Sequence, residues 1–482
     1  MPFASSSLLS SVLETLIILT HLLLLLALSV AFFPHSWNIR NWHLKWVVFF
    51  IGLTFTELAL PFVVLDWILV IVTGSQWLRL YNVALPFGHS VDGFLPRVAG
   101  LVVTAFCSMM LAGVLYNFIT AWTVVCKEME KAAWSSRGKL TLGVLGEAVF
   151  TSLIPIWRPL GLSVNKDITY LTPEELKQMQ LTDEEQLMVQ LDVIRQEKPT
   201  SKPRPIFMYI HGGAWSMGDK RQITSPICWH MANRHNFVVV NVNYRLSTRK
   251  GPRGGAVRPA KYPDHLIDCK RALRWIRLNA HKYGGDPDFV AVSGNSAGGH
   301  LAAMLALTQN VETFQPGYNH ADFPSWFSAA ICGRTSYDEH WLKVRACPMS
   351  LVPSIRAFSG SDSSLKMADN GVDQRSESPI PPFLIFHGAN DNIVPHTTVR
   401  HFTKRLAQYF ASPFSAAAAP GPATDSDPRH NKAIPPVMYF EFPYAHHAFD
   451  IFNNPRAVLV SYVAGQYLSA AYDEWTKSHQ TQ

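Results

Sequence analysis

A serine lies between two glycines at a point where a strand is expected to give way to a helix. The segment Gly294-Asn295-Ser296-Ala297-Gly298 has the form G-x-S-x-G, with AVS before it and HLAAMLAL after it. The glycines allow a sharp turn that projects the hydroxyl group of Ser296 away from the chain. Ser296 is therefore a candidate nucleophile, and a plain strand-to-helix turn is the competing interpretation.

Glycines also follow the apolar run PIFMYI, in the segment HGGAW that begins at His211. Glycines after a strand leave backbone N–H groups free, and these can hold an oxyanion together with the N–H group that follows a nucleophile. The candidates for this oxyanion hole are Gly212, Gly213, Ala214 and Ala297. His211 is expected to brace the loop. The alternative is a turn plugged by an aromatic side chain.

A carboxylate and a histidine complete a catalytic set. Asp391 follows the run FLIFHG, and His446 and His447 follow VMYFEFPYA. A carboxylate can orient an imidazole, and an imidazole can take the proton of a serine hydroxyl group. A helix cap at Asp391 and surface positions for the histidines are the alternatives. The adjacent histidines are not expected to bind a metal ion, because neighbouring side chains diverge and no ligand cluster accompanies them.

The elements that must position these residues are predicted from the alternation of apolar runs and helical segments. From about residue 165 this alternation predicts an α/β fold, with a mostly parallel sheet and helices on both faces. In such sheets ligands bind at the carboxyl ends of the strands, where all four motifs lie. We expect one catalytic domain over residues 165–482, with a low-complexity loop at 411–435.

The motifs together resemble one branch of a known family. The segments HGGAW, NYRL, YGGDPDFVAVSGNSAGGHLA, HGANDNIVP and HHAFD are similar to the hormone-sensitive-lipase-like branch of the α/β-hydrolases. More closely, they resemble carboxylesterases with amino-terminal membrane spans. The resemblance implies an α/β-hydrolase fold, with Ser296 as nucleophile, Asp391 as acid and His447 as base, since His447 precedes Ala-Phe. The branch commonly has HGGG, where this chain has Ala214 in place of the third glycine.

The amino-terminal part differs in composition from the rest. Residues 1–126 hold four basic and four acidic residues, so the formal net charge of +7 belongs to the remainder of the chain. Three apolar runs occur there, at 15–33, 46–73 and 98–126. About 20 apolar residues can cross the hydrocarbon core of a bilayer. The sequence therefore predicts an all-α transmembrane region with about three helices, followed by a linker at 127–164 that holds an interfacial helix.

The location of the catalytic domain is predicted from basic residues. A cluster follows the third apolar run, at Lys127, Lys131, Arg137 and Lys139. Basic residues favour the cytoplasmic side of a membrane. We expect an integral multi-pass protein with a cytoplasmic catalytic domain, in the endoplasmic reticulum if the chain is eukaryotic.

The function predicted from these features is that of a membrane-anchored serine carboxylesterase or lipase. Its expected partners are an ester or lipid-like small molecule and membrane lipid, and no cofactor or metal is expected. Nucleic acid is not an expected partner, because no run of Lys and Arg with interleaved aromatic residues occurs. Alternatives on the same triad are a prenylcysteine methylesterase and a deacetylase. An alternative of another class is a catalytically inactive hydrolase fold that serves as a membrane binding module. Nothing in the sequence indicates an oligomeric state.

Overall fold

The computed structural model describes most of the catalytic domain and the helices before it. The described residues are 94–132, 142–154, 158–221, 226–309, 311–315, 327–333, 380–391, 393–411 and 434–480. The apolar runs 15–33 and 46–73 and most of the low-complexity loop 411–435 lie outside the described residues, so they stay predictions.

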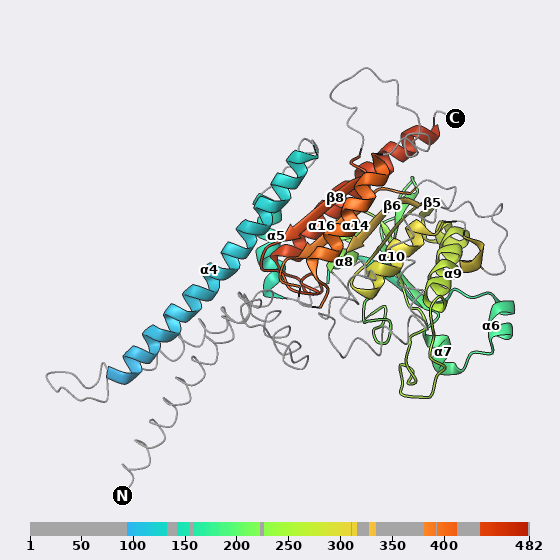
Figure 1. The fold of residues 1–482 in the computed structure, drawn as a ribbon, viewed down its shortest axis with the longest axis horizontal. Coiled ribbons are helices and arrows are strands. Elements are labelled where there is room, and N and C mark those ends of the chain that lie inside the picture. The colour runs from blue at the N-terminus through green and yellow to red at the C-terminus, as the bar shows by residue number, and fades with distance from the viewer. Residues whose placement is uncertain are drawn as a thin grey trace, which may run out of the picture.

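A sheet of eight described strands forms the centre of the fold (Figure 1). The strands are β1 (Leu162–Thr169), β2 (Gln190–Gln196), β3 (Arg204–Ile210), β4 (Val238–Val242), β5 (Gly285–Gly294), β6 (Phe327–Gly333), β7 (Phe383–Gly388) and β8 (Val437–Phe442). Their order is β1-β2-β4-β3-β5-β6-β7-β8. β2 pairs antiparallel with both β1 and β4, whereas every pair from β4 to β8 is parallel. The sheet is therefore mixed, and its large parallel part has one common carboxyl edge.

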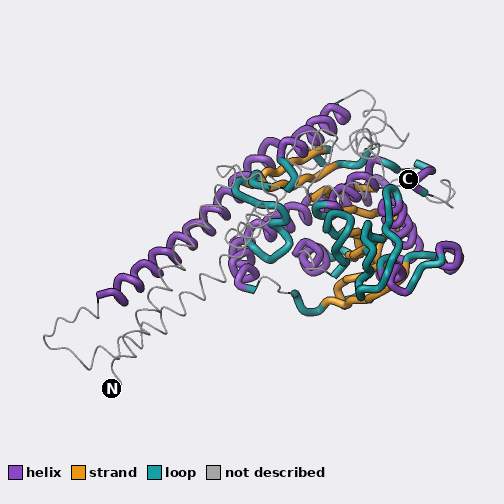
Figure 2. Tube along the Cα trace, turned by 60° about the horizontal axis from the view of Figure 1, so that its bottom comes forward, coloured by secondary structure: helices purple, strands orange, loops and turns teal. Residues whose placement is uncertain are grey.

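Helices cover both faces of the sheet (Figure 2). One face packs on α9 (Asp264–Asn279), α10 (Ala297–Leu307) and α14 (His396–Phe410), and the other on α8 (Pro226–Arg234) and α16 (Pro455–Gln480). In β3, Ile206 and Met208 join the first core, while Phe207 and Tyr209 join the second. Strands covered on both faces need continuous apolar runs, as β3 and β4 have. The expected α/β class with helices on both faces is confirmed.

Short helices connect the remaining elements. They are α6 (Pro173–Met179), α7 (Asp183–Leu187), and the 3₁₀ turns η3 (Ala280–Tyr283) and η4 (Glu312–Phe314). Both α6 and α7 begin with a capping box, in which a threonine and the glutamate three residues later bond to each other's backbone N–H groups. The capping boxes stabilise the first turns of these two helices, which lie in the connection between β1 and β2.

Within the described residues, two helices precede the sheet, α4 (Phe94–Lys131) and α5 (Leu142–Leu153). The apolar run 98–126 lies within α4, a single helix of 38 residues. Across the described part of the chain, no helix combines the length and the apolarity needed to cross a membrane. The predicted all-α transmembrane region is therefore not supported there.

The second half of α4 packs on the catalytic domain. Phe118, Ala121, Val125 and Met129 are buried and recur every three or four residues, which places them on one face of the helix. They belong to the same core as α16 and β8, and α4 contacts both elements. The catalytic domain therefore includes contacts from residues that precede residue 127.

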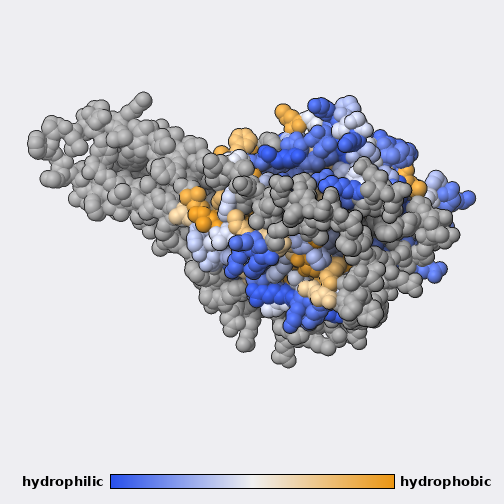
Figure 3. Space-filling view, turned by 90° about the horizontal axis from the view of Figure 1, so that it is seen from above, coloured by the Kyte–Doolittle hydropathy of each residue, from blue (hydrophilic) through white to orange (hydrophobic). Residues whose placement is uncertain are grey.

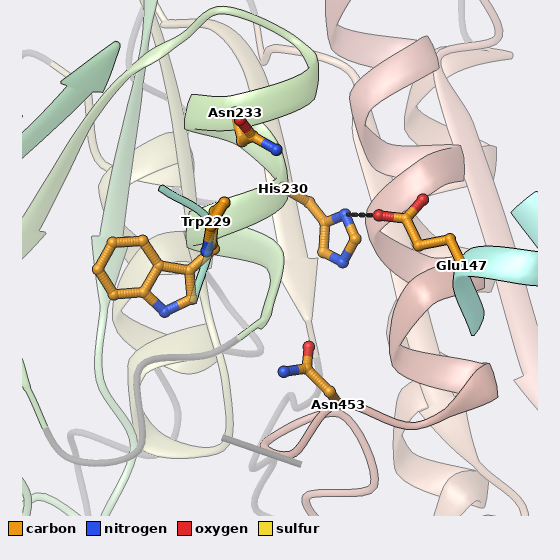
Figure 4. Close-up of a pocket in the computed structure, with 6 residues that line it drawn as sticks. Glu147, Trp229, His230, Asn233 and Asn453 are labelled. Atoms are coloured by element: carbon orange, nitrogen blue, oxygen red, sulfur yellow. Dashed lines mark ion pairs between the residues drawn. The ribbon is translucent and has the colours of Figure 1, made fainter. Parts of the chain in front are cut away.

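α5 lies in the predicted linker and also packs on this core, through Val144 and Ala148. Its Glu147 is paired with Arg234 of α8 at 2.6 Å and lies 3.5 Å from Nδ1 of His230 (Figure 4). Burial raises the pKa of Glu147, against the opposing charge of Arg234. The shallow pocket around this pair is lined by Glu147, Pro159, Trp229, His230, Asn233 and Asn453. The Glu147–Arg234 ion pair thus joins α5 to α8.

A buried lysine is expected to make the stability of the domain depend on pH. Lys270 of α9 is buried, and its Nζ donates to the carbonyl oxygen of Thr308 and, at 2.9 Å, to Oε1 of Gln315. Burial lowers the pKa of Lys270 to about 7. In the unfolded chain the amine keeps a pKa of about 10.4, so between about pH 7 and 10 the unfolded state binds more protons. We expect this group to raise the free energy of unfolding by up to about 1.4 kcal/mol per pH unit in that window.

The measurement is thermal unfolding of the full chain in detergent at several pH values from neutral to alkaline. The matched variant is Lys270→Met, which keeps an unbranched side chain of similar length to the apolar part of lysine and removes the titrating amine. The free energy of unfolding of the wild type, minus that of the variant, should increase as the pH rises. A difference that stays constant with pH would contradict the neutral, buried amine.

Candidate active site

Ser296 occupies a strained turn between β5 and α10. Its φ of 52° and ψ of −122° lie in a region that residues with a side chain rarely adopt, at a cost of about 1–3 kcal/mol. α10 begins at the next residue, Ala297. The G-x-S-x-G segment therefore has the strand–turn–helix context that a nucleophile elbow requires.

Gly298, two residues after Ser296, allows α10 to approach β3. A Cβ atom on Gly298 would lie against the carbonyl oxygen of Ile210 and 2.6 Å from that of His211. These oxygens belong to the end of β3 and the start of the next loop. Any side chain at this position would therefore push the first turn of α10, and the elbow with it, away from the sheet.

The structure brings Ser296, Asp391 and His447 together. Nε2 of His447 lies 3.0 Å from Oγ of Ser296, and Nδ1 lies 2.8 Å from Oδ2 of Asp391. A carboxylate accepts hydrogen bonds, so Nδ1 carries the hydrogen and Nε2 can accept from the serine hydroxyl group. Asp391 and His447 are buried, at 2% and 6% exposed, whereas Ser296 is partly exposed. The hydroxyl group is thus reachable and its two partners are shielded.

Asp391 is fixed in the turn after β7. Its Oδ1 accepts the backbone N–H groups of Ile393 at 2.9 Å and Val394 at 2.7 Å. Burial alone raises the pKa of Asp391, but the charge and hydrogen bond of His447, the nearby His387 and the Val394 N–H group outweigh it. The pKa therefore lies well below its usual value. Asp391 is not the cap of α14, whose N-cap is Pro395.

The two adjacent histidines have different surroundings. His446 is fully buried, and His447 bonds to the serine and the aspartate. Tyr444 and Ala448, on either side of the pair, have φ values of 59° and 58°. These left-handed residues shape the loop that directs the His447 side chain towards the elbow.

The loop after β3 packs against the turn at Ser296. Gly213, Ala214 and Trp215 have successive positive φ values of 121°, 51° and 56°. A Cβ atom on Gly212 would lie 3.1 Å from Cβ of Ser296. The described residues contain no backbone carbonyl that accepts the N–H groups of Gly213, Ala214 or Ala297. The absence of a side chain on Gly212 therefore leaves room for the elbow.

His211 is tied into the same loop. Its ring stacks on Tyr244, with centroids 4.5 Å apart, and its Nδ1 donates to the carbonyl oxygen of Gly212 at 2.7 Å. Burial lowers the pKa of His211 to about 4, so the ring is neutral at pH 7. The hydroxyl group of Tyr244 donates to the carbonyl oxygen of His211 at 3.1 Å. These contacts hold the backbone of the loop.

Two residues of the site were not singled out from the sequence. Tyr244 lies in the NYRL segment, and His387 begins HGANDNIVP. His387 donates from Nε2 to the carbonyl oxygen of Val394 at 3.1 Å and lies 3.8 Å from Asp391. The sequence signal for Tyr244 and His387 is their presence in the quoted motifs. A single tyrosine or histidine has no local pattern that indicates which loop it supports.

Sheet order, elbow and side-chain geometry together define an α/β-hydrolase fold. The BD-FAE family model matches residues 191–331. The chain is 34% identical to the probable carboxylic ester hydrolase LipM of Mycobacterium tuberculosis over 271 residues, which are 56% of this chain and 54% of LipM. It is 25% identical over 223 residues to the probable isoprenylcysteine alpha-carbonyl methylesterase ICMEL1 of Arabidopsis thaliana, covering 43% of each chain.

Among solved structures, esterase B from Lactobacillus rhamnosis superposes with a TM-score of 0.46 and 17% identity, over 75% of this chain and 99% of that protein. The chain spans about half the length of the curated relatives it matches.

The close approach of α10 to β3 predicts the effect of a single methyl group. Gly298→Ala should destabilise the domain by about 1–3 kcal/mol or more, because the Cβ atom meets two backbone oxygens that cannot rotate away. The matched control is Gly146→Ala on α5, where a Cβ atom meets nothing within 4 Å. That change should stabilise its helix by about 0.5–1 kcal/mol. Thermal unfolding compares the two, and a Gly298→Ala protein as stable as wild type would contradict the observed packing.

Proposed function

We propose that this chain is a membrane-associated serine hydrolase that cleaves carboxylic esters, with Ser296 as nucleophile, His447 as base and Asp391 as acid. The observation that carries the proposal is the position of His447, within hydrogen-bonding distance of both Ser296 Oγ and Asp391 Oδ2. The names of relatives such as LipM support an ester as the substrate.

Acylation begins at the serine. Oγ of Ser296 attacks the ester carbonyl carbon while Nε2 of His447 takes the hydroxyl proton. The carbonyl oxygen gains the electron pair and is bound by the N–H groups of Gly213, Ala214 and Ala297. The intermediate then collapses, the carbon–oxygen bond to the leaving group breaks, and His447 returns the proton to the departing alcohol.

Deacylation repeats these steps with water. His447 takes a proton from the water molecule as its oxygen attacks the acyl-enzyme, and Ser296 recovers the proton when the acid leaves. The low pKa of Asp391 keeps its carboxylate ionised, which stabilises the imidazolium that forms twice in the cycle. Every step uses groups of this chain and water.

The decisive experiment removes the nucleophile and the base one at a time. Ser296→Ala and His447→Ala should each lower kcat on p-nitrophenyl butyrate by about 10⁶-fold, as loss of the serine or the histidine does in a well-characterised serine protease. Ser296→Ala should also abolish labelling by a fluorophosphonate probe. Ser296→Ala removes one oxygen atom, whereas His447→Ala removes a buried ring, so thermal unfolding would verify that each variant is folded.

The matched control is the neighbouring histidine. His446→Ala makes the same change one residue away, so it should retain hydrolysis if the variant folds. An active His447→Ala beside a folded, inactive His446→Ala would reverse the assignment of the base. Activity retained in Ser296→Ala would disprove the nucleophile.

A prenylcysteine methylesterase is the second candidate, favoured by the similarity to ICMEL1. The chemistry would be identical, with methanol as the leaving group. Comparing methanol release from a farnesylcysteine methyl ester with hydrolysis of acyl p-nitrophenyl esters distinguishes the two. A deacetylase would instead release acetate from acetylated substrates. An inactive binding module would show no labelling of Ser296.

The proposed membrane association rests on the apolar amino-terminal sequence and on exposed side chains. Of ten exposed large hydrophobic residues in the described parts, eight lie between Leu115 and Leu160. They are Leu115, Tyr116 and Ile119 of α4, Val149, Phe150 and Leu153 of α5, and Ile154 and Leu160 just after it. In Figure 3, hydrophilic residues cover much of the described body, and one hydrophobic patch lies at the left end of the described surface. Concentrated apolar exposure is typical of a membrane or protein contact.

The orientation proposed for the membrane-associated chain puts the catalytic domain in the cytoplasm. The support is the basic cluster at Lys127, Lys131, Arg137 and Lys139. In a eukaryotic cell the proposed membrane is the endoplasmic reticulum.

Extraction of membranes with alkaline carbonate tests the association. The full chain should stay in the pellet, because apolar runs in contact with hydrocarbon are not released by high pH. Ser296→Ala should behave identically, since its change lies in the active site. Release of the wild-type chain into the supernatant would contradict membrane insertion.

A further inference from the structure

The loop that carries His447 contacts a helix more than 300 residues earlier in the sequence. Tyr116 of α4 and Tyr444 of the loop have ring centroids 5.6 Å apart, and their hydroxyl oxygens lie 3.4 Å apart. Tyr444 precedes His447 by three residues. The amino-terminal helix and the proposed catalytic base are therefore separated by one side-chain contact and a short stretch of backbone.

Buried side chains of the same loop pack in the core that α4 also contacts. Ala445 and Phe449 are fully buried and lie two residues before and two residues after His447. Phe449 packs edge-on against Phe442, with ring centroids 5.4 Å apart. Phe118 and Ala121 of α4 belong to the same core. Without α4, the core beneath the His447 loop would lose part of its cover.

The backbone of the loop needs such support. Tyr444 and Ala448 both hold positive φ values, a conformation that persists in a residue with a side chain only where surrounding contacts maintain it. Two other parts of the fold bond to the loop backbone: the N–H group of Asn390, after β7, donates to the carbonyl oxygen of Ala445 at 3.0 Å, and the side chain of Arg456 in α16 donates to that of Pro443 at 3.0 Å. Tyr116 approaches the loop from α4.

We propose that α4 holds the His447 loop in its reactive position, with Tyr116 as a positioning residue that acts through Tyr444. This inference rests on the proposed function, because it concerns the placement of Nε2 of His447 relative to Oγ of Ser296. Proton transfer is sensitive to that placement: a shift of about 1 Å can cost about 10²-fold in rate. The amino-terminal helix is thus part of the support of the active site.

The test uses the full chain in detergent with a soluble short-chain ester. Tyr116→Ala should lower kcat about tenfold and leave KM unchanged, since the substrate site is intact and the alignment of the base is not. The rate of fluorophosphonate labelling, which also needs the base, should fall by the same factor. Tyr116→Phe keeps the ring contact and should stay within about twofold of wild type.

A matched control lies on the same helix. Thr123 is exposed and its hydroxyl group bonds within α4, to the carbonyl oxygen of Ile119 at 2.8 Å. Thr123→Ala should leave kcat, KM and labelling unchanged. Because Tyr116 is half-exposed, the melting temperature of Tyr116→Ala should stay close to that of wild type.

A double-mutant cycle identifies the route of the effect. If Tyr116 acts through Tyr444, Tyr116→Ala should add little to Tyr444→Ala. Strictly additive losses would overturn the proposed route, and a Tyr116→Ala enzyme as active as Thr123→Ala would overturn the positioning role. A loss that appears in KM or in melting temperature alone would identify a purely structural contact. A wild-type chain that neither hydrolyses esters nor takes the label would disprove the proposed function, and this inference with it.

Discussion

The placement of one imidazole ring decides what the site can do. His447 is bonded on one side to a buried carboxylate and on the other to a partly exposed hydroxyl group. Either bond alone would be an ordinary contact, since serine, histidine and aspartate occur in many loops. Together they direct the lone pair of Nε2 at Oγ. The sheet serves this geometry because its parallel strands end on one edge, which brings together turns that are far apart in the sequence.

Close backbone packing makes that geometry possible. The elbow at Ser296 is strained, and strain of this kind survives only where neighbouring elements enforce it. Gly298 lets α10 approach the end of β3, and Gly212 lets the loop after β3 approach the elbow. The cost of the turn is offset by the burial of α10, in which every residue is buried. Stability of the core and strain at the nucleophile are thus parts of one arrangement.

The sequence predicts separate parts for the apolar amino-terminal region, the linker and the catalytic domain. In the structure, α4 and α5 pack on the core of that domain. The apolar run 98–126 and α5, in the linker where the sequence predicts an interfacial helix, have the composition of membrane-associated helices, yet part of each is buried against α16 and its neighbours. The same helices keep hydrophobic side chains exposed on their other faces. These helices therefore pack on the protein through one face and expose apolar side chains on the other, and the proposed membrane association rests on those exposed side chains.

The sequence by itself determined the α/β class, the elbow and the order of the Ser, Asp and His motifs. These features are local, because glycine spacing and apolar runs act within a few residues of the chain. The residues alone left His446 and His447 open, and the family resemblance favoured His447. The tertiary structure places His447 next to Ser296, because adjacent side chains diverge according to the backbone of a loop with positive φ values. It alone placed Tyr244 on His211 and Tyr116 on Tyr444, since such contacts leave no local pattern. It also decided which face of α4 is buried, because an apolar side chain gains as much from a protein core as from lipid, and composition does not distinguish the two.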